Sequence, residues 1–137
     1  NDVNISNIER AEIANKVNAD LFVRIHADGA ADSRVHGVSI LIPGNMYIKD
    51  EDVLSKSRQA ASSILDSVVN ETGAYSRGLI VSNDMTGFNW CKVPMLLIET
   101  GFLSNPEEER KLSDEQYQRT IANGIYKGIE KYFSNNF

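Results

Sequence analysis

The sequence is poor in cysteine, in long apolar runs and in clustered positive charge, and each shortage excludes a class of protein. Its one cysteine, Cys91, rules out an internal disulfide in the 137 residues, and we expect it to be a small packed residue rather than a nucleophile. No apolar stretch has the length of a membrane span, and the first residues lack the pattern of a signal peptide. The net charge is -5 and Lys and Arg do not cluster, which argues against a nucleic-acid partner.

What is present indicates one globular domain, residues 1–137, with enough chain to bury a core. The composition is 42% hydrophobic and 24% charged, and we find no internal repeat, linker or low-complexity segment. Apolar patterns predict strands over 21–26, 38–42, 79–81 and 94–98, and helices over 8–17, 53–69, from 106 and over 117–133. Capping boxes at Ser6 and Ser113, and Asn105 followed by Pro106, predict three of the helix starts. Alternating helices and strands favour a three-layer α/β domain whose sheet is mixed and mostly parallel, flanked by helices.

The chain is organised around residues 94–106, PMLLIETGFLSNP. Five apolar residues without alternation are typical of a strand that is covered on both faces. Glu99 follows at once, where we expect the strand to end, and open α/β sheets place their ligands at the carboxyl ends of strands. The alternative is a strand-end acid that is solvated or paired with a lysine.

His26 occupies the matching place at the end of the predicted strand 21–26, and it shares a strand face with Phe22 and Arg24. If the two strands are parallel neighbours, His26 and Glu99 meet at one edge of the sheet. Imidazole is the commonest metal ligand, and a carboxylate can take a proton from a metal-activated water. Alternatively, His26 is a packed or hydrogen-bonded residue. We assign His36 to the loop surface.

Met46 and Tyr47 lie in the connection that follows the strand 38–42. They could line a cleft or cover the core. The segment 82–90 is expected to be a loop rich in polar and aromatic side chains.

Two sequence blocks together closely resemble the type-3 family of zinc-dependent N-acetylmuramoyl-L-alanine amidases. They are residues 19–28, ADLFVRIHAD, and residues 93–105, VPMLLIETGFLSN, and residues 76–78 and 84–90 also match the family pattern. The resemblance extends from about residue 8 to residue 133. It implies a zinc-exopeptidase-like amidase fold and hydrolysis of the amide between N-acetylmuramic acid and L-alanine in peptidoglycan.

By this resemblance, His26 would be a zinc ligand and Glu99 the catalytic carboxylate. We assign contacts to glycan or peptide to Arg77, Asn89 and Trp90. The alternative is that Trp90 packs against the last helix and that Arg77 makes a surface ion pair.

The family pattern has two further zinc ligands, a histidine and a glutamate, upstream of the segment that begins this sequence. We therefore expect an N-terminally incomplete catalytic domain that lacks its first strands. Asp28 also departs from the pattern, because the family usually has asparagine there. Some members of the family carry a long inserted segment between the positions of His26 and Val38, and this segment blocks the zinc. The loop is short here, so the resemblance implies an unblocked enzyme of the sporulation, germination or lysin kind, acting outside the cell at the wall. A regulatory protein partner that binds elsewhere is a further possibility.

Two other readings stay open at this stage. The chain could be a non-catalytic peptidoglycan-binding or regulatory module of the same fold. It could also be an α/β interaction domain in which His26 and Glu99 are structural.

Overall fold

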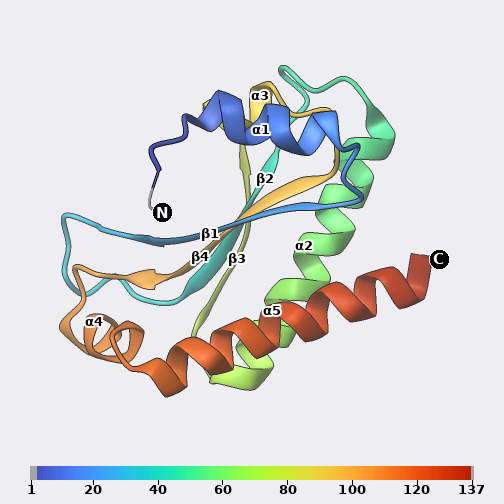
Figure 1. Ribbon diagram of the computed structural model, residues 1–137. Coiled ribbons are helices and arrows are strands. Elements are labelled where there is room, and N and C mark those ends of the chain that lie inside the picture. Colours follow the sequence, from blue (N-terminus) through green and yellow to red (C-terminus); the bar gives the residue numbers. More distant parts are fainter. Residues whose placement is uncertain (1–2, 137) are drawn as a thin grey trace.

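A four-stranded sheet runs through the centre of the computed structural model, which describes residues 3–136 (Figure 1). The strands are β1 (Phe22–Asp28), β2 (Val38–Pro43), β3 (Ser76–Ser82) and β4 (Met95–Phe102), in the spatial order β1-β4-β2-β3. β1 is parallel to β4 and β2 is parallel to β3, whereas β2 and β4 are antiparallel. The sheet is therefore mixed and mostly parallel, which confirms the predicted fold class.

Because β2 and β4 are antiparallel, strands have their carboxyl ends at both ends of the sheet. β1 and β4 finish at one end, where Glu99 lies opposite Ser39 near the start of β2. β2 and β3 finish at the other end, beside the start of β4. We call these the β1/β4 end and the β2/β3 end.

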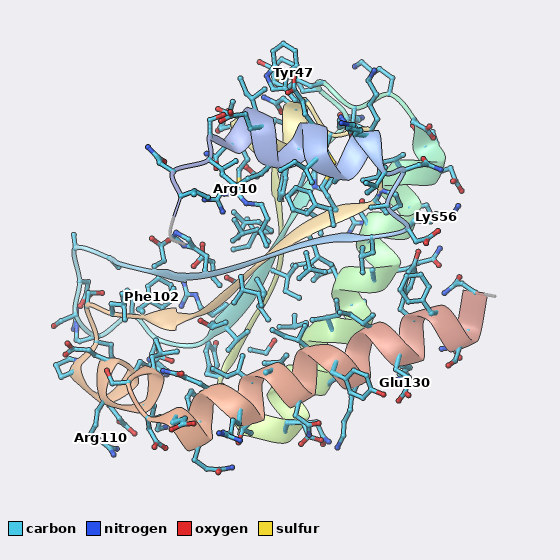
Figure 2. All side chains as sticks on the ribbon, in the orientation of Figure 1. Arg10, Tyr47, Lys56, Phe102, Arg110 and Glu130 are labelled. Carbon is cyan, nitrogen blue, oxygen red and sulfur yellow. The ribbon has the colours of Figure 1, made fainter. Side chains whose placement is uncertain are left out.

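Two long helices, α2 (Glu51–Thr72) and α5 (Glu115–Asn136), cover one face of the sheet (Figures 1 and 2). The apolar stripe predicted for the first of them is buried against the strands and α5. Gly128 and Gly124 let the two helices approach closely, because a Cβ on Gly128 would collide with the Ile64 backbone and a Cβ on Gly124 would lie 2.8 Å from the Val68 Cα. The larger core cluster, formed here, contains Val38, Ile40, Ile42, Ala60, Ala61, Ile64, Leu65, Val68, Leu96, Ile98, Ile121, Ile125 and Tyr132.

The opposite face of the sheet is covered by shorter helices, α1 (Asn7–Lys16) and α3 (Thr86–Asn89). A second core cluster forms here, with Ala11, Phe88, Met95 and Leu97 among its buried members. Cys91 belongs to it at 2% exposure, which confirms its packed role. The remaining helix, α4 (Pro106–Leu112), lies beyond the carboxyl end of β4.

Local capping signals account for most helix boundaries. The predicted capping box of α1 is present, with Ser6 and Glu9 bonded reciprocally through side chain and backbone. Asn105 caps α4 by accepting from the backbone N–H groups of Glu107 and Glu108. Gly73 ends α2 in the left-handed conformation, as its position predicts.

Three expectations about boundaries were wrong. Helix α5 is capped by Asp114, whose carboxylate accepts from the backbone N–H groups of Gln116 and Tyr117, while Ser113 closes α4. The segment 82–90 contains the helical turn α3 instead of being wholly a loop. All four strands run beyond their apolar stretches, because ladder hydrogen bonds continue through polar residues. No helix within residues 3–136 is long and apolar enough to cross a membrane.

Candidate active site

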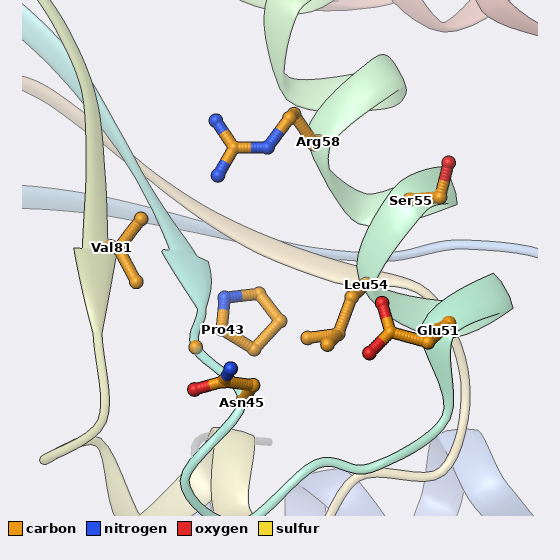
Figure 3. A pocket seen from close by; sticks show the side chains of 8 residues that line it. Pro43, Asn45, Glu51, Leu54, Ser55, Arg58 and Val81 are labelled. Carbon is orange, nitrogen blue, oxygen red and sulfur yellow. The ribbon is translucent and has the colours of Figure 1, made fainter.

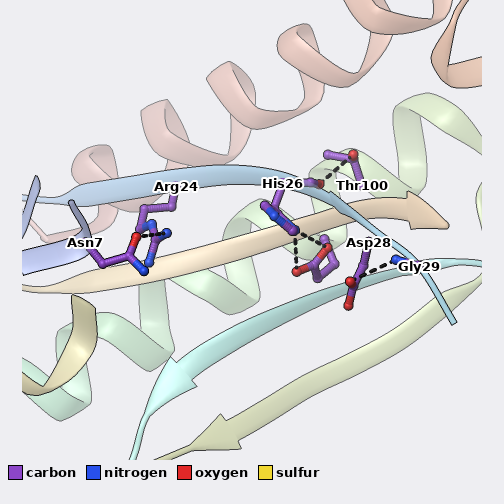
Figure 4. A network of polar contacts seen from close by, with 7 residues as sticks. Asn7, Arg24, His26, Asp28, Gly29 and Thr100 are labelled. Carbon is purple, nitrogen blue, oxygen red and sulfur yellow. Dashed lines mark hydrogen bonds and ion pairs between the residues drawn. The ribbon is translucent and has the colours of Figure 1, made fainter. Parts of the chain in front are cut away.

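His26 and Glu99 lie side by side on neighbouring parallel strands, on the sheet face that carries α1. They are register partners in the β1–β4 ladder, and His26 Nδ1 lies 3.1 Å from Glu99 Oε1 and 3.2 Å from Oε2 (Figure 4). The convergence expected from the sequence is therefore present. The expectation that each residue ends its strand was wrong, because β1 continues to Asp28 and β4 to Phe102.

The two side chains differ in their exposure to solvent. The imidazole of His26 is 53% exposed, whereas the carboxylate side chain of Glu99 is only 9% exposed. Burial raises the pKa of Glu99 above its ordinary value, and the hydrogen bond from His26 acts in the opposite direction. A carboxyl group that holds its proton more readily and faces a half-exposed imidazole is suited to proton transfer. It is not the solvated or lysine-paired acid of the alternative reading.

Two hydrogen bonds fix the strands around this pair. Thr100 Oγ1 donates to the backbone oxygen of His26 at 2.8 Å, so the residue after Glu99 holds the residue that faces it. Asp28 Oδ1 accepts from the Gly29 N–H at 2.8 Å and orders the chain as it leaves β1. The pair is thus held on strands rather than on a loop, which limits its movement.

Glu108, on α4, fastens the same end of the sheet from outside. Its Oε1 accepts from the backbone N–H groups of Gly37, just before β2, and Phe102, at the end of β4, both at 3.0 Å. One carboxylate therefore joins α4 to two strands. The sequence predicts the helix that carries Glu108 but not the partners of its side chain, which are far away in the chain or across a turn.

Arg24 is a further side chain of this face that sequence reasoning did not select. Its Nη2 donates to Asn7 Oδ1 at 2.8 Å, while its Nη1 lies against Gly87, where an added Cβ would be 2.9 Å away. Among residues 3–136, this Nη1 is the buried side-chain nitrogen or oxygen atom that lacks a hydrogen-bond partner. Burial lowers the pKa of Arg24, with a further contribution from the positive charge of Arg10. The sequence did contain a signal for Arg24, because side chains alternate along a strand and this places Arg24 on the same face as His26.

The predicted substrate contacts divide between the two ends of the sheet. Arg77, at the start of β3, lies at the β1/β4 end, where its guanidinium is 5.3 Å from the centre of the Phe102 ring and donates to the backbone oxygen of His36 at 3.3 Å. Asn89 and Trp90 lie at the β2/β3 end. The alternative that Trp90 packs on the last helix is wrong, because its backbone oxygen is bound by Asn15 of α1 and its side chain is 55% exposed.

Two cavities flank residues 44–50 at the β2/β3 end. One, of about 470 Å³, lies between the ends of β2 and β3 and the first turns of α2, and is lined by Pro43, Leu54, Arg58 and Val81 among others (Figure 3). The other, of about 410 Å³, is lined by Tyr47, Asn89 and Trp90 among others. Met46 and Tyr47 are both 57% exposed, so they do not cover the core.

The described residues supply only part of a zinc site. A catalytic zinc takes three protein ligands and leaves one position open. Within residues 3–136, no three His, Cys, Asp or Glu side chains come together in an arrangement able to hold a metal ion. His26 fits one ligand position, and the remaining positions are not supplied by the described residues.

Residues 1–131 match the family model described as N-acetylmuramoyl-L-alanine amidase. The chain belongs to this amidase family. The two sequence blocks and the paired His26 and Glu99 are thus features of an amidase-family chain.

Individual relatives agree with this assignment. The germination-specific N-acetylmuramoyl-L-alanine amidase of Bacillus subtilis is 30% identical, over 92% of this chain and 50% of the relative. The catalytic domain of the amidase CwlV from Paenibacillus polymyxa has a TM-score of 0.84 at 28% identity, covering 98% of this chain and 69% of that one. The amidase CwlD from Clostridioides difficile, solved in complex with the lipoprotein GerS, has a TM-score of 0.81 at 31% identity, covering 92% and 60%.

The chain is shorter than its curated relatives. It spans 40%, 57% and 56% of the lengths of the amidase AmiB of Haemophilus influenzae, the protein YqiI of Bacillus subtilis and the amidase AmiA of Escherichia coli. The family and the fold therefore apply to this chain directly, while the activity of a whole relative is a proposal for it.

Proposed function

We propose that this chain is the part of a peptidoglycan amidase that carries the catalytic carboxylate, and that the protein cleaves the amide between N-acetylmuramic acid and L-alanine. The observation that carries the proposal is the contact between His26 Nδ1 and Glu99 Oε1 at 3.1 Å, in a chain of the amidase family. Glu99 takes a proton from the attacking water and passes it to the nitrogen that leaves with the alanine. Its raised pKa favours the protonated state that this second transfer requires.

His26 is proposed as one ligand of a zinc ion, with the other ligands coming from outside this sequence. A zinc ion held there would polarise the amide carbonyl and lower the pKa of a water molecule towards neutral. The half-exposed imidazole of His26 suits a ligand that faces residues beyond the described set. Arg77 is proposed to contact the substrate at the same end of the sheet.

The proposed location of the enzyme rests on its substrate, and the proposed timing of its action rests on a relative. Peptidoglycan lies outside the cytoplasmic membrane, so we place the enzyme at the cell wall. The germination-specific relative and the short segment between β1 and β2 support an unblocked enzyme of the sporulation or germination kind. The relative that was solved with a lipoprotein supports a regulatory partner.

The deciding experiment uses the complete gene product that carries this chain and measures peptide release from a muropeptide. Glu99→Gln keeps the shape of the side chain but removes its ability to accept a proton, so kcat/KM should fall by about 10²- to 10⁴-fold. Glu107→Gln, on the exposed side of α4, is the matched control and should be neutral. Activity of the Glu99→Gln protein close to wild type would overturn the role of Glu99.

A second function is favoured by one observation, the lack of a three-ligand set within residues 3–136. A non-catalytic wall-binding or regulatory module would bind muropeptide without cleaving it. Metal analysis of the complete gene product separates the two functions. The amidase should hold about one zinc per molecule and lose it in His26→Ala, whereas the module should hold none.

A further inference from the structure

The cavity at the β2/β3 end combines exposed aromatic rings with polar groups, far from the catalytic pair. It is lined by residues from two separate segments, Tyr47, Lys49, Asp50, Asn89, Trp90 and Lys92 among them. Tyr47 and Trp90 are 57% and 55% exposed. Large aromatic side chains bury much apolar area when they find a partner, so two that share a hollow and remain in solvent form a ready contact surface.

The protein backbone around the cavity is held in place before any ligand binds. Asn15 of α1 clamps the turn after α3, because its Nδ2 donates to the Trp90 oxygen at 2.9 Å and its Oδ1 accepts from the Lys92 N–H at 2.7 Å. On the other side, Asn83 Oδ1 accepts from the Met46 N–H at 3.1 Å. Because the backbone that lines the cavity is already fixed, it loses little conformational entropy when a ligand binds.

We propose that this cavity is a saccharide-binding site, which holds the glycan of peptidoglycan while the peptide bond is cleaved at the other end of the sheet. The choice of a saccharide rests on the proposed amidase function. Sugar rings present flat C–H faces that stack on aromatic rings, and their hydroxyl and acetamido groups need donors and acceptors close by. Asn89 supplies both kinds of group and Lys92 supplies donors. Lys49 and Asp50 mainly shape the cavity, because Lys49 Nζ donates to the Asn45 backbone oxygen at 2.6 Å and Asp50 Oδ1 caps α2 by accepting from the Asp52 and Val53 N–H groups.

The distance between the two sites suits a polymeric substrate. From Met95, at the start of β4, to Glu99 the strand rises about 13 Å at about 3.3 Å per residue, and the cavity lies beyond Met95 in the direction away from Glu99. Tyr47 is at the far top of the molecule in Figure 2 and Phe102 is near the carboxyl end of β4. A single sugar would not reach both sites, whereas a glycan strand with attached peptides would.

The test titrates the complete gene product with a peptide-free tetrasaccharide of alternating N-acetylglucosamine and N-acetylmuramic acid. Trp90 is the one tryptophan of the 137 residues, so the emission that Trp90→Phe lacks reports directly on the cavity. We expect a saturable change in this emission. Tyr47→Ala should raise the saccharide concentration at the midpoint about tenfold or more. Tyr126→Ala, on the outer side of α5 at 59% exposure, is the matched control and should leave the midpoint unchanged.

The outcomes separate this inference from the proposed function. Glu99→Gln should bind the tetrasaccharide as wild type does, since the catalytic pair lies at the other end. A wild-type protein that binds the tetrasaccharide but releases no peptide from a muropeptide supports the saccharide site and contradicts the amidase. Peptide release from a muropeptide without a saturable emission change on adding the tetrasaccharide would overturn the saccharide site. A midpoint that Tyr47→Ala does not move, or an emission response to a free stem peptide in place of the saccharide, would overturn it as well.

Discussion

Glu108 is the side chain through which helix α4 holds the β1/β4 end together. Replacing it with Gln turns a charged acceptor of two backbone N–H groups into a neutral one and leaves one acceptor oxygen where there were two. Because hydrogen bonds to charged groups are the stronger ones, we expect the free energy of unfolding to fall by about 1–3 kcal/mol. Urea denaturation measures this loss.

The neighbouring Glu109 provides the control for that measurement. It lies on the same helix with an exposed side chain, so Glu109→Gln should change stability by less than about 0.5 kcal/mol. Equal effects of the two substitutions would mean that Glu108 acts only through the charge of α4.

Single residues also show how far sequence reasoning reaches. His26 and Glu99 could be paired in advance, because each follows an apolar run and parallel neighbours bring such positions together. The position of the Arg24 guanidinium could not be predicted, because it depends on Asn7 and Gly87, which come from two other segments. The separation of Asn89 and Trp90 from His26 and Glu99 also escaped prediction, since it depends on strand direction.

At the scale of elements, α2 and α5 pack closely where Gly128 faces Ile64. Gly128→Ala would place a Cβ against the backbone of Ile64, which cannot move without shifting α2. Overpacking of this kind typically costs about 1–3 kcal/mol, even though Ala favours a helix over Gly. Thermal denaturation followed by circular dichroism should show the lower Tm.

Gly29→Ala is the matched substitution for this helix contact. A Cβ at Gly29 would meet nothing within 4 Å, so its Tm should stay close to that of the wild-type chain. A Gly128→Ala protein as stable as wild type would show that the two helices have room to move apart.

The lengths of the elements were harder to predict than their presence. Apolar runs located all four strands, but each strand extends into polar residues, such as Thr100 in β4 and Ser76 in β3. Ladder pairing decides where a strand ends, and pairing partners are not visible in one strand alone. In the same way, Ser113 and Asp114 were both able to cap α5, and only the geometry of the turn after α4 selects Asp114.

Across the whole molecule, one strand joins the two core clusters. β4 sends Leu96 and Ile98 into the cluster beneath α2 and α5, and Met95 and Leu97 into the cluster beneath α1 and α3. Neither cluster can lose its packing without exposing β4 to water. We therefore expect the two layers to unfold in one cooperative transition.

Two optical signals report on the two layers separately. The emission of Trp90 follows the layer of α1 and α3, while the far-ultraviolet circular dichroism is dominated by α2 and α5, with 22 residues each. Their denaturation curves should coincide in midpoint and slope. Curves that separate by more than the measurement error would show two independent units.

The mixed direction of the sheet was predicted, but the place of β4 between β1 and β2 was not, because the sequence reveals the order of elements and not their neighbours. That reversal of direction has a consequence for how such a protein can change over time. In an all-parallel sheet, all loops that follow the strands lie at the same end, so a substitution that alters ligand binding there is also close to the reactive side chains. Here the loops that follow β2 and β3 are a strand's length away from His26 and Glu99. Substitutions in those loops can therefore accumulate without disturbing the geometry of the His26–Glu99 pair.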